Sequence, residues 1–299
     1  MQPNEIPVLL IPFRRPTKIK QLITALAKVQ PKYIYVLADG PRPGLPEEAR
    51  LCAEARRIAT DIPWPCEIHT HFKDTNVGLT ENVTEGIDWF FDHVEYGIIL
   101  EDDCIPDPSF FTFCAVLLPY YKDNERIMHI SGNNFQNGVS RSDGSYYFSH
   151  YSHSWGWATW RRAWKRHIEA LSHLHREGPD AVIETLPFSD AAKLFWKKHL
   201  QKGSHWDGLW VYTTWYAKGL SILPNQNLVS NHGFDAEATH THEPSEQANL
   251  QNIPLEKVIH PTSIAVNTEA DEYTFTTMFY TQFKKKLRNK ISAILKKFL

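Results

Sequence analysis

The N-terminal third of the chain contains four short strand-like runs, and segments with helical patterns separate them. Three runs are continuously apolar and one alternates with polar residues; they cover residues 7–12 (PVLLIP), 33–38 (YIYVLA), 66–72 (CEIHTHF) and 97–100 (GIIL). Continuous runs of this length are typical of strands buried on both faces. Their alternation with helices predicts an α/β fold with a mostly parallel, doubly wound sheet and helices on both faces.

The segments between these runs each predict a helix. Residues 16–29 carry an apolar stripe at helical spacing, residues 46–60 open with Pro46 and two glutamates, and the segment from Thr80 to Val94 repeats the apolar spacing. Proline and acidic residues favour the first turn of a helix. The pattern therefore predicts three complete strand-and-helix units before the fourth strand.

Charged residues follow three of the four predicted strands. Arg14 and Arg15 come after the first strand, Asp39 after the second, and the triplet Glu101-Asp102-Asp103 after the fourth. The carboxyl ends of parallel strands share one edge of a sheet, where open α/β sheets bind their ligands. This coincidence predicts a nucleotide site, although Arg15 could instead cover helix surface and Asp39 could cap a turn.

The acidic triplet is the strongest chemical signal in the chain. Three adjacent carboxylates repel one another, so the pKa of at least one should rise unless a hard divalent cation neutralises the group. Pro106 and Pro108 are expected to lead the backbone out of regular structure after it. The competing interpretation is an acidic turn that caps the following helix.

The second half is aromatic and less regular. Residues 146–149 and 220–223 are strand-like, and residues 188–202 form an amphipathic helical pattern. Trp157, Trp160 and Trp164 recur at i, i+3 and i+7, which predicts a buried stripe on one helix.

Composition narrows the class of protein. The 299 residues have a formal net charge of −2, but the segment from Lys284 to Lys297 holds seven basic residues and no acid, so the remainder carries −2 minus seven, or −9. An acidic body without a recognisable module argues against nucleic-acid binding. Four cysteines without CxxC spacing, and no pattern of a signal peptide or of a membrane span, predict a cytoplasmic setting.

The triplet and the residues after it resemble a known family. Glu101-Asp102-Asp103 is followed by Pro108-Ser109-Phe110-Phe111-Thr112-Phe113, and a later strand, residues 127–131, is followed by Asn133-Asn134. This arrangement resembles GT-A fold glycosyltransferases, most closely the inverting N-acetylglucosaminyltransferase I group and its bacterial relatives. The resemblance spans residues 7–245 and implies a Rossmann-like GT-A domain.

The resemblance also implies roles for individual residues. Asp103 would bind Mn²⁺ or Mg²⁺, which bridges the donor diphosphate, while Glu101 and Asp102 would contact the donor ribose or sugar. Arg15 and Asp39 fall where the family holds the base and nucleoside. The implied donor is a nucleoside-diphosphate sugar, with a UDP-sugar favoured, and the acceptor a hydroxyl of a glycan or lipid-linked molecule. Trp155 and Gly156, which precede the tryptophan stripe, are candidates for the donor-sugar pocket.

A segment that contains His205-Trp206-Asp207-Gly208 matches the region where the family places its general base, which implies that Asp207 deprotonates the acceptor hydroxyl. The family has two adjacent aspartates here, so the register could differ by one residue. His205 is an alternative base, and Asp207 as the N-cap of the following helix is an alternative without a catalytic role.

A further segment, residues 238–242 (ATHTH), corresponds to a mobile loop in the family, which implies that Thr239 and His240 contact phosphate or metal. A zinc site made by His232, His240 and His242 is the competing interpretation.

The domain boundaries follow from these patterns. Residues 1–245 are expected to form the glycosyltransferase domain, with a nucleotide-sugar half at 1–135 and an acceptor half at 136–245. Residues 246–278 are expected to be an irregular connector. Residues 279–299 predict a basic amphipathic helix, which either contacts the inner, anionic face of the plasma membrane or docks on the domain.

Together the sequence predicts a hexosyltransferase or N-acetylhexosaminyltransferase. A sugar nucleotidyltransferase is the enzymatic alternative, but the segment after the first strand, residues 12–16 (PFRRP), lacks the glycines that such enzymes usually carry there. A non-enzymatic glycan-binding module that uses the tryptophans is the other alternative, and it has no need of the acidic triplet.

Overall fold

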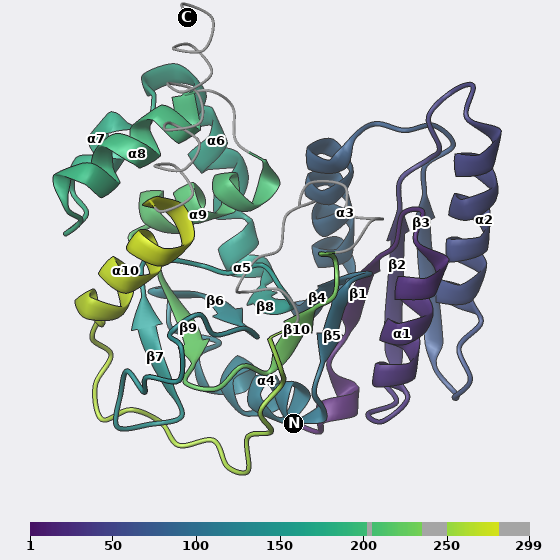
Figure 1. Cartoon of the computed structure of the whole chain (residues 1–299), viewed down its shortest axis with the longest axis horizontal. Coiled ribbons are helices and arrows are strands. Elements are labelled where there is room, and N and C mark those ends of the chain that lie inside the picture. Colours follow the sequence, from purple (N-terminus) through teal and green to yellow (C-terminus); the bar gives the residue numbers. More distant parts are fainter. Residues whose placement is uncertain (202–204, 235–249, 281–299) are drawn as a thin grey trace, which may run out of the picture.

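The computed structural model describes residues 1–201, 205–234 and 250–280 (Figure 1). The strands of the described chain are β1 (Val8–Ile11), β2 (Tyr33–Ala38), β3 (Glu67–Phe72), β4 (Tyr96–Glu101), β5 (Cys104–Pro106), β6 (Ile127–Ser131), β7 (Tyr146–Ser149), β8 (Trp157–Trp160), β9 (Leu220–Pro224) and β10 (Val229–Asn231). The helices are η1 (Pro3–Glu5), α1 (Pro16–Leu26), α2 (Pro46–Thr60), α3 (Leu79–His93), α4 (Pro108–Tyr120), α5 (Arg161–Trp164), α6 (Arg166–Glu177), α7 (Asp180–Glu184), α8 (Asp190–Gln201), α9 (Trp206–Tyr216), α10 (Thr268–Thr274) and η2 (Phe275–Tyr280).

A central eight-stranded sheet organises the molecule, in the order β3-β2-β1-β4-β8-β6-β9-β7. The first four strands in this order are parallel, as predicted. Strand β8 then runs antiparallel to both β4 and β6, and β7 runs antiparallel to β9, while β6 and β9 are parallel. The α/β prediction is confirmed, with antiparallel strands confined to the second half of the sheet.

The strands of the first half are buried on both faces because helices cover both. Successive side chains of a strand point to opposite faces. Val8 and Leu10 of β1 pack with α1 and α4, whereas Leu9 and Ile11 pack with α3 and α9. This explains why these runs are continuously apolar rather than alternating.

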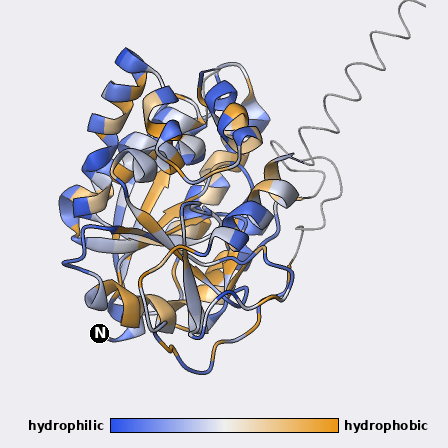
Figure 2. Ribbon diagram, turned by 90° about the vertical axis from the view of Figure 1, so that its left-hand side faces the viewer, coloured by the Kyte–Doolittle hydropathy of each residue, from blue (hydrophilic) through white to orange (hydrophobic). Residues whose placement is uncertain are grey.

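Helices α6, α7, α8 and α9 gather beside the second half of the sheet and share their own apolar core (Figure 1). Most helices alternate between polar and apolar colour along their length in Figure 2, as expected of helices that turn one face to the core. This helical group places the start of α9 over the carboxyl edge of the parallel strands, where the site is expected.

A small ribbon connects distant parts of the chain next to that edge. Strand β10 pairs antiparallel with β5, and Asn231 lies opposite Cys104. The ribbon also corrects the prediction that the backbone leaves regular structure after the triplet, because residues 104–106 form β5. The prolines are accommodated since this ribbon has only two strands and Pro106 ends its strand.

The tryptophan stripe is buried but is not helical. Trp157 and Trp160 lie in β8, and only Trp164 lies in the short helix α5. All three are at most 3% exposed. The prediction of one helix was wrong because β8 is a central strand covered on both faces, so its burial does not follow a period of two and mimics a helical spacing.

The predicted irregular connector is also corrected. Residues 268–280, expected to be irregular as far as 278, form α10 and η2. Gln136 donates to the hydroxyl of Thr274 at 2.9 Å, and the ring of Phe279 lies 5.0 Å from that of Trp196. The first residue of the predicted C-terminal helix therefore packs on the domain. Residues 281–299, which hold the basic part of that prediction, lie outside the described residues.

Within the described chain, no helix is both long and apolar enough to cross a bilayer. The four cysteines are all unpaired, and three of them are buried.

Three buried histidines should make stability depend on pH. Burial lowers the pKa of His129 and His153 to about 3 and that of His167 to about 4. His129 is held neutral between two partners: its Nδ1 accepts from the indole of Trp210 at 3.1 Å, and its Nε2 lies 3.1 Å from the carbonyl oxygen of His153. The unfolded chain therefore binds protons more readily than the folded chain between pH 6.5 and 3, so these groups stabilise the fold above pH 6.5 and this contribution is lost as pH falls.

Between pH 7 and pH 5 the free energy of unfolding of the wild-type chain should fall by about 2 kcal/mol more than that of His129→Asn, because the variant lacks this histidine. The variant should still be less stable than wild type at both pH values. Urea unfolding at the two pH values measures this. The raised pKa values of Glu101 and Asp102 act in the opposite sense, but they are common to both proteins and cancel in the comparison. His175→Asn, on the exposed face of α6, is the control; a pH dependence of His129→Asn equal to that of this control would contradict the assignment.

Candidate active site

A cleft of about 650 Å³ opens at the carboxyl edge of the parallel strands. It is bounded by the ends of β1, β2 and β4, the start of α3, the segment before β8, the start of α9 and the end of β10. The lining includes Arg14, Arg15, Asp39, Arg42, Asn82, Glu101, Asp102, Asp103, Trp155, His205, Asp207, Asn231 and Phe234. The structure thus gathers in one cleft most of the described site residues that the sequence predicts.

The acidic triplet sits next to Arg15 because β1 and β4 are neighbours in register. Ile11 lies opposite Glu101, so the residues after both strands emerge side by side. Arg15 makes a two-pronged ion pair with Asp102 through Nε and Nη2, and Nη2 also lies 2.8 Å from Oδ2 of Asp103. Bidentate guanidinium–carboxylate pairs hold both partners in a defined orientation. Arg15 therefore positions the carboxylates instead of covering helix surface.

Crowding and burial shift the protonation of the triplet. Burial, with the charges of Asp103 and Asp102 beside it, raises the pKa of Glu101 to about 8, and Asp207 adds to the effect. Burial likewise raises the pKa of Asp102 to about 6, although Arg15 acts against it. Burial and repulsion within the triplet therefore favour the protonated form of Glu101.

Asp103 is held from the other side by the end of β10. Its Oδ1 accepts from Asn231 Nδ2 at 3.3 Å, and its Oδ2 would lie 2.2 Å from a Cβ atom at position 233. Gly233 is therefore required for the close approach of this loop to the carboxylate. Asn231 and Gly233 could not be selected from local sequence patterns, because pairing of β10 with β5 brings them to Asp103 across 128 residues, counted from Asp103 to Asn231.

These surroundings fit a hard divalent cation. Carboxylate oxygen is the ligand that Mg²⁺ and Mn²⁺ prefer, and such ions commonly use one or two carboxylates together with water and substrate phosphates. Among the described residues no three His, Cys, Asp or Glu side chains converge as a metal cage. Asp103 fits a site in which one protein carboxylate binds the ion. Gly233 lies beside it without a side chain, and the hydrogen bond from Asn231 to its Oδ1 is long, at 3.3 Å.

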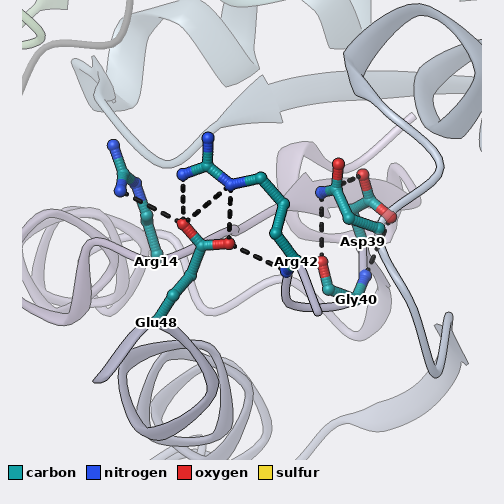
Figure 3. A network of polar contacts seen from close by, with 6 residues as sticks. Arg14, Asp39, Gly40, Arg42 and Glu48 are labelled. Carbon is teal, nitrogen blue, oxygen red and sulfur yellow. Dashed lines mark hydrogen bonds and ion pairs between the residues drawn. The ribbon is translucent and has the colours of Figure 1, made fainter. Parts of the chain in front are cut away.

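The carboxylate of Asp39 accepts hydrogen bonds from four donors of the protein itself. Its Oδ1 accepts from the backbone of Gly40 and Val77 at 2.8 and 2.9 Å, and its Oδ2 accepts from Asn76 Nδ2 and the backbone of Gly78 at 2.8 and 3.0 Å. Figure 3 shows Asp39 next to Gly40, whose backbone nitrogen donates to it. Four donors use the whole acceptor capacity of a carboxylate. Its geometry favours the turn-capping alternative over contact with a nucleoside.

We expect Asp39→Asn to lower the free energy of unfolding by roughly 1–3 kcal/mol, because the new amide group faces a donor and leaves it unsatisfied. Urea denaturation measures the loss. Asp61→Asn, whose side chain is 79% exposed at the end of α2, is the matched control and should change stability little. If the loss of unfolding free energy in Asp39→Asn were no larger than that in the control, the turn-capping role would be contradicted and a role of Asp39 in ligand binding would be favoured.

Of the two residues predicted for the donor-sugar pocket, Trp155 lines the cleft and Gly156 does not. Trp155 lines the cleft, with its ring edge-on to Phe135 at 4.9 Å and to Phe234 at 5.4 Å. Gly156 has φ of +68° and packs against Val229, where a Cβ atom would come within 2.8 Å of a methyl group. Gly156 does not line the cleft of the described residues, so it shapes the backbone that presents Trp155.

Asp207 reaches the cleft from the opposite half of the molecule. It lies in the first turn of α9, for which His205 is the N-cap residue, so the alternative of Asp207 as the N-cap is wrong. Its Oδ1 accepts from the next backbone amide, Gly208, at 2.8 Å. The side chain is exposed and lines the cleft together with His205.

Two predicted phosphate ligands, Thr239 and His240, lie outside the described residues, as does His242 of the alternative zinc site. His232, its remaining member, lies 3.1 Å from the hydroxyl of Ser230 through Nε2.

Comparisons with known proteins give distant likenesses. Scans against protein families and against curated proteins find no match. Among solved structures, a mannosyltransferase, PcManGT from Pyrobaculum calidifontis in complex with GDP-Man and Mn²⁺, aligns with a TM-score of 0.38 and 12% identity over 72% of this chain and 70% of that chain. A UDP-glucose pyrophosphorylase complexed with UDP-glucose aligns with a TM-score of 0.32 and 11% identity over 55% of this chain and 80% of that chain. Likenesses this remote do not bear on the chemistry of the cleft, which rests on its own residues.

Proposed function

We propose that the protein is a metal-dependent, inverting glycosyltransferase that moves a sugar from a nucleoside-diphosphate sugar to a hydroxyl of a glycan or lipid-linked acceptor. One observation carries the proposal. A single cleft is lined by Asp103, at the end of a parallel strand, and by Asp207, at the start of a helix from the other half of the chain. A displacement reaction requires a leaving-group site and a separate base.

The strand edge would hold the donor. Asp103 would bind Mn²⁺ or Mg²⁺, which when bound neutralises charge that develops on the departing diphosphate. Arg15 keeps Asp102 and Asp103 in a fixed orientation and adds positive charge at the place where the diphosphate would lie. Trp155 offers an aromatic wall beside this edge for the donor sugar.

The start of α9 would activate the acceptor. The acceptor hydroxyl loses its proton to the carboxylate of Asp207 while its oxygen forms a bond to the anomeric carbon. The bond between that carbon and the diphosphate oxygen breaks, and the electron pair leaves with the nucleoside diphosphate. Because Asp207 is exposed and lines the cleft, its carboxylate is accessible to the acceptor hydroxyl and can take this proton.

Calorimetry with UDP and GDP, each with and without Mn²⁺, tests the proposal on the full chain. We expect nucleotide binding that depends on the metal. Absence of such binding would contradict a nucleotide-sugar enzyme and favour a glycan-binding module. Release of inorganic pyrophosphate from a nucleoside triphosphate and a sugar phosphate would instead identify a sugar nucleotidyltransferase.

A further inference from the structure

Two arginines at one end of the cleft share a buried carboxylate. Glu48, in the first turn of α2, is 5% exposed. Arg42 donates to it from its backbone nitrogen at 2.9 Å and from Nε at 3.0 Å, and Arg14 donates from Nη1 at 3.2 Å. The hydrogen bonds from Arg42 lower the pKa of Glu48 to about 2, against the effect of burial. Glu48 is therefore ionised and orients both guanidinium groups (Figure 3).

The loop that carries Arg42 is itself held in place. Gly40 packs so closely on Thr75 that a Cβ atom would lie 2.4 Å from its backbone. The backbone amide of Asn76 donates to the carbonyl oxygen of Pro41 at 3.2 Å, and its side chain donates to that of Gly40 at 3.1 Å. A guanidinium on such a loop loses little conformational freedom when a ligand binds.

The pair retains donors for a ligand. The side chains of Arg14 and Arg42 are 35% and 50% exposed, and both residues line the cleft. Glu48 balances only one of the two positive charges. In Figure 3 the guanidinium nitrogens of Arg14 and Arg42 that are not bonded to Glu48 point away from its carboxylate. A guanidinium can only donate hydrogen bonds, so the pair can meet only acceptor atoms.

The position of the pair indicates which part of a nucleotide it would meet. Arg14 turns to Glu48, whereas its neighbour Arg15 turns to Asp103. Strand β1 separates β4 from β2, so the ends of β4 and β2 are two strand spacings apart, roughly 10 Å. With the diphosphate at the end of β4, the nucleoside would extend to the end of β2. There the carboxylate of Asp39 has no acceptor capacity left, whereas Arg14 and Arg42 keep N–H donors that do not bond to Glu48.

We propose that Arg14 and Arg42, held by Glu48, read the base of the nucleotide donor. The pair selects a base with a carbonyl oxygen at the edge where adenine and cytosine carry an amino group, which means uracil or guanine. Arginine discriminates bases in this way because it pairs with carbonyl and ring-nitrogen acceptors and opposes amino donors. The inference rests on the proposed nucleotide-sugar function and assigns the base specificity of the same cleft.

Calorimetry in the presence of Mn²⁺ tests this with UDP, GDP, CDP, ADP and inorganic pyrophosphate. The wild-type chain should bind UDP or GDP roughly tenfold to a hundredfold more tightly than CDP and ADP. Arg42→Gln should remove this preference and leave the affinity for pyrophosphate unchanged. Arg14→Gln should act in the same direction, which keeps the test open if Arg42→Gln folds poorly. Arg50→Gln, 59% exposed on α2 and paired with Glu47 and Glu54, should behave as wild type.

Two results would overturn the inference. Equal affinity of the wild-type chain for all four nucleotides would show that the base is not read. Equal weakening of the four nucleotides and of pyrophosphate by Arg42→Gln would show that the pair binds phosphate. Failure of the wild-type chain to bind any nucleotide would instead contradict the proposed function itself.

Discussion

Asp207→Asn is expected to lower sugar transfer by roughly 10²- to 10⁴-fold while leaving the affinity for nucleotide and metal unchanged. The amide keeps the size of the side chain and can still accept from Gly208, but it cannot take a proton from the acceptor. Donor hydrolysis or transfer, measured beside nucleotide calorimetry, separates the two quantities.

Asp190→Asn is the matched control, because Asp190 is also an exposed aspartate in the first turn of a helix, α8, but does not line the cleft. His205→Gln tests the alternative base. Loss of transfer with His205→Gln and not with Asp207→Asn would move the role to His205. Loss of nucleotide affinity in Asp207→Asn would show that this residue supports the structure of the cleft.

Asp103→Asn should abolish the dependence of nucleotide affinity on Mn²⁺. The substitution removes the only charge of the residue that we assign to the cation, and hard divalent ions bind a neutral amide much more weakly than a carboxylate. Direct titration of Mn²⁺ in the presence of UDP or GDP measures the effect without relying on turnover. The same change weakens the ion pair with Arg15, so the unfolding free energy should be measured as well.

Asp74→Asn, in an exposed loop outside the cleft, is the control for Asp103→Asn. Retained metal-dependent binding in Asp103→Asn would move the cation to another carboxylate of the triplet. Since Asp103→Asn should affect binding and Asp207→Asn should affect only transfer, the two variants together distinguish the two ends of the cleft.

Much of the parallel half of the sheet could be predicted because its signals are local. Strands buried on both faces have to be continuously apolar, and a strand, a turn and a helix of this length leave few other arrangements than a parallel sheet. That arrangement alone places Arg15, Asp39 and the acidic triplet on one edge. The structure places the triplet and Arg15 together in a cleft at this edge, and the ion pair between Arg15 and Asp102 excludes the alternative that Arg15 covers helix surface.

Predictions failed where the same residue pattern fits two structures. A central strand with both faces covered buries every residue, so Trp157 and Trp160 of β8 could be taken for helical positions. Asp39 shows the corresponding limit for polar groups. Its position at a strand end was predicted, but only the loop from Asn76 to Gly78, folded back over it, decides that its four acceptor sites are filled by the protein.

The sequence by itself determined the parallel half of the sheet, the edge on which charged residues gather, and the acidic triplet at that edge, because these depend on the order of neighbouring elements. The tertiary structure alone decided what each carboxylate does. Pairing of β10 with β5 brings Asn231 and Gly233 to Asp103, helix α9 brings Asp207 to the same cleft, and the β2–α2 loop aims Arg42 at its other end. Hydrogen-bond partners and charges act over a few ångströms in space, and the residues that supply them here are separated by long stretches of chain.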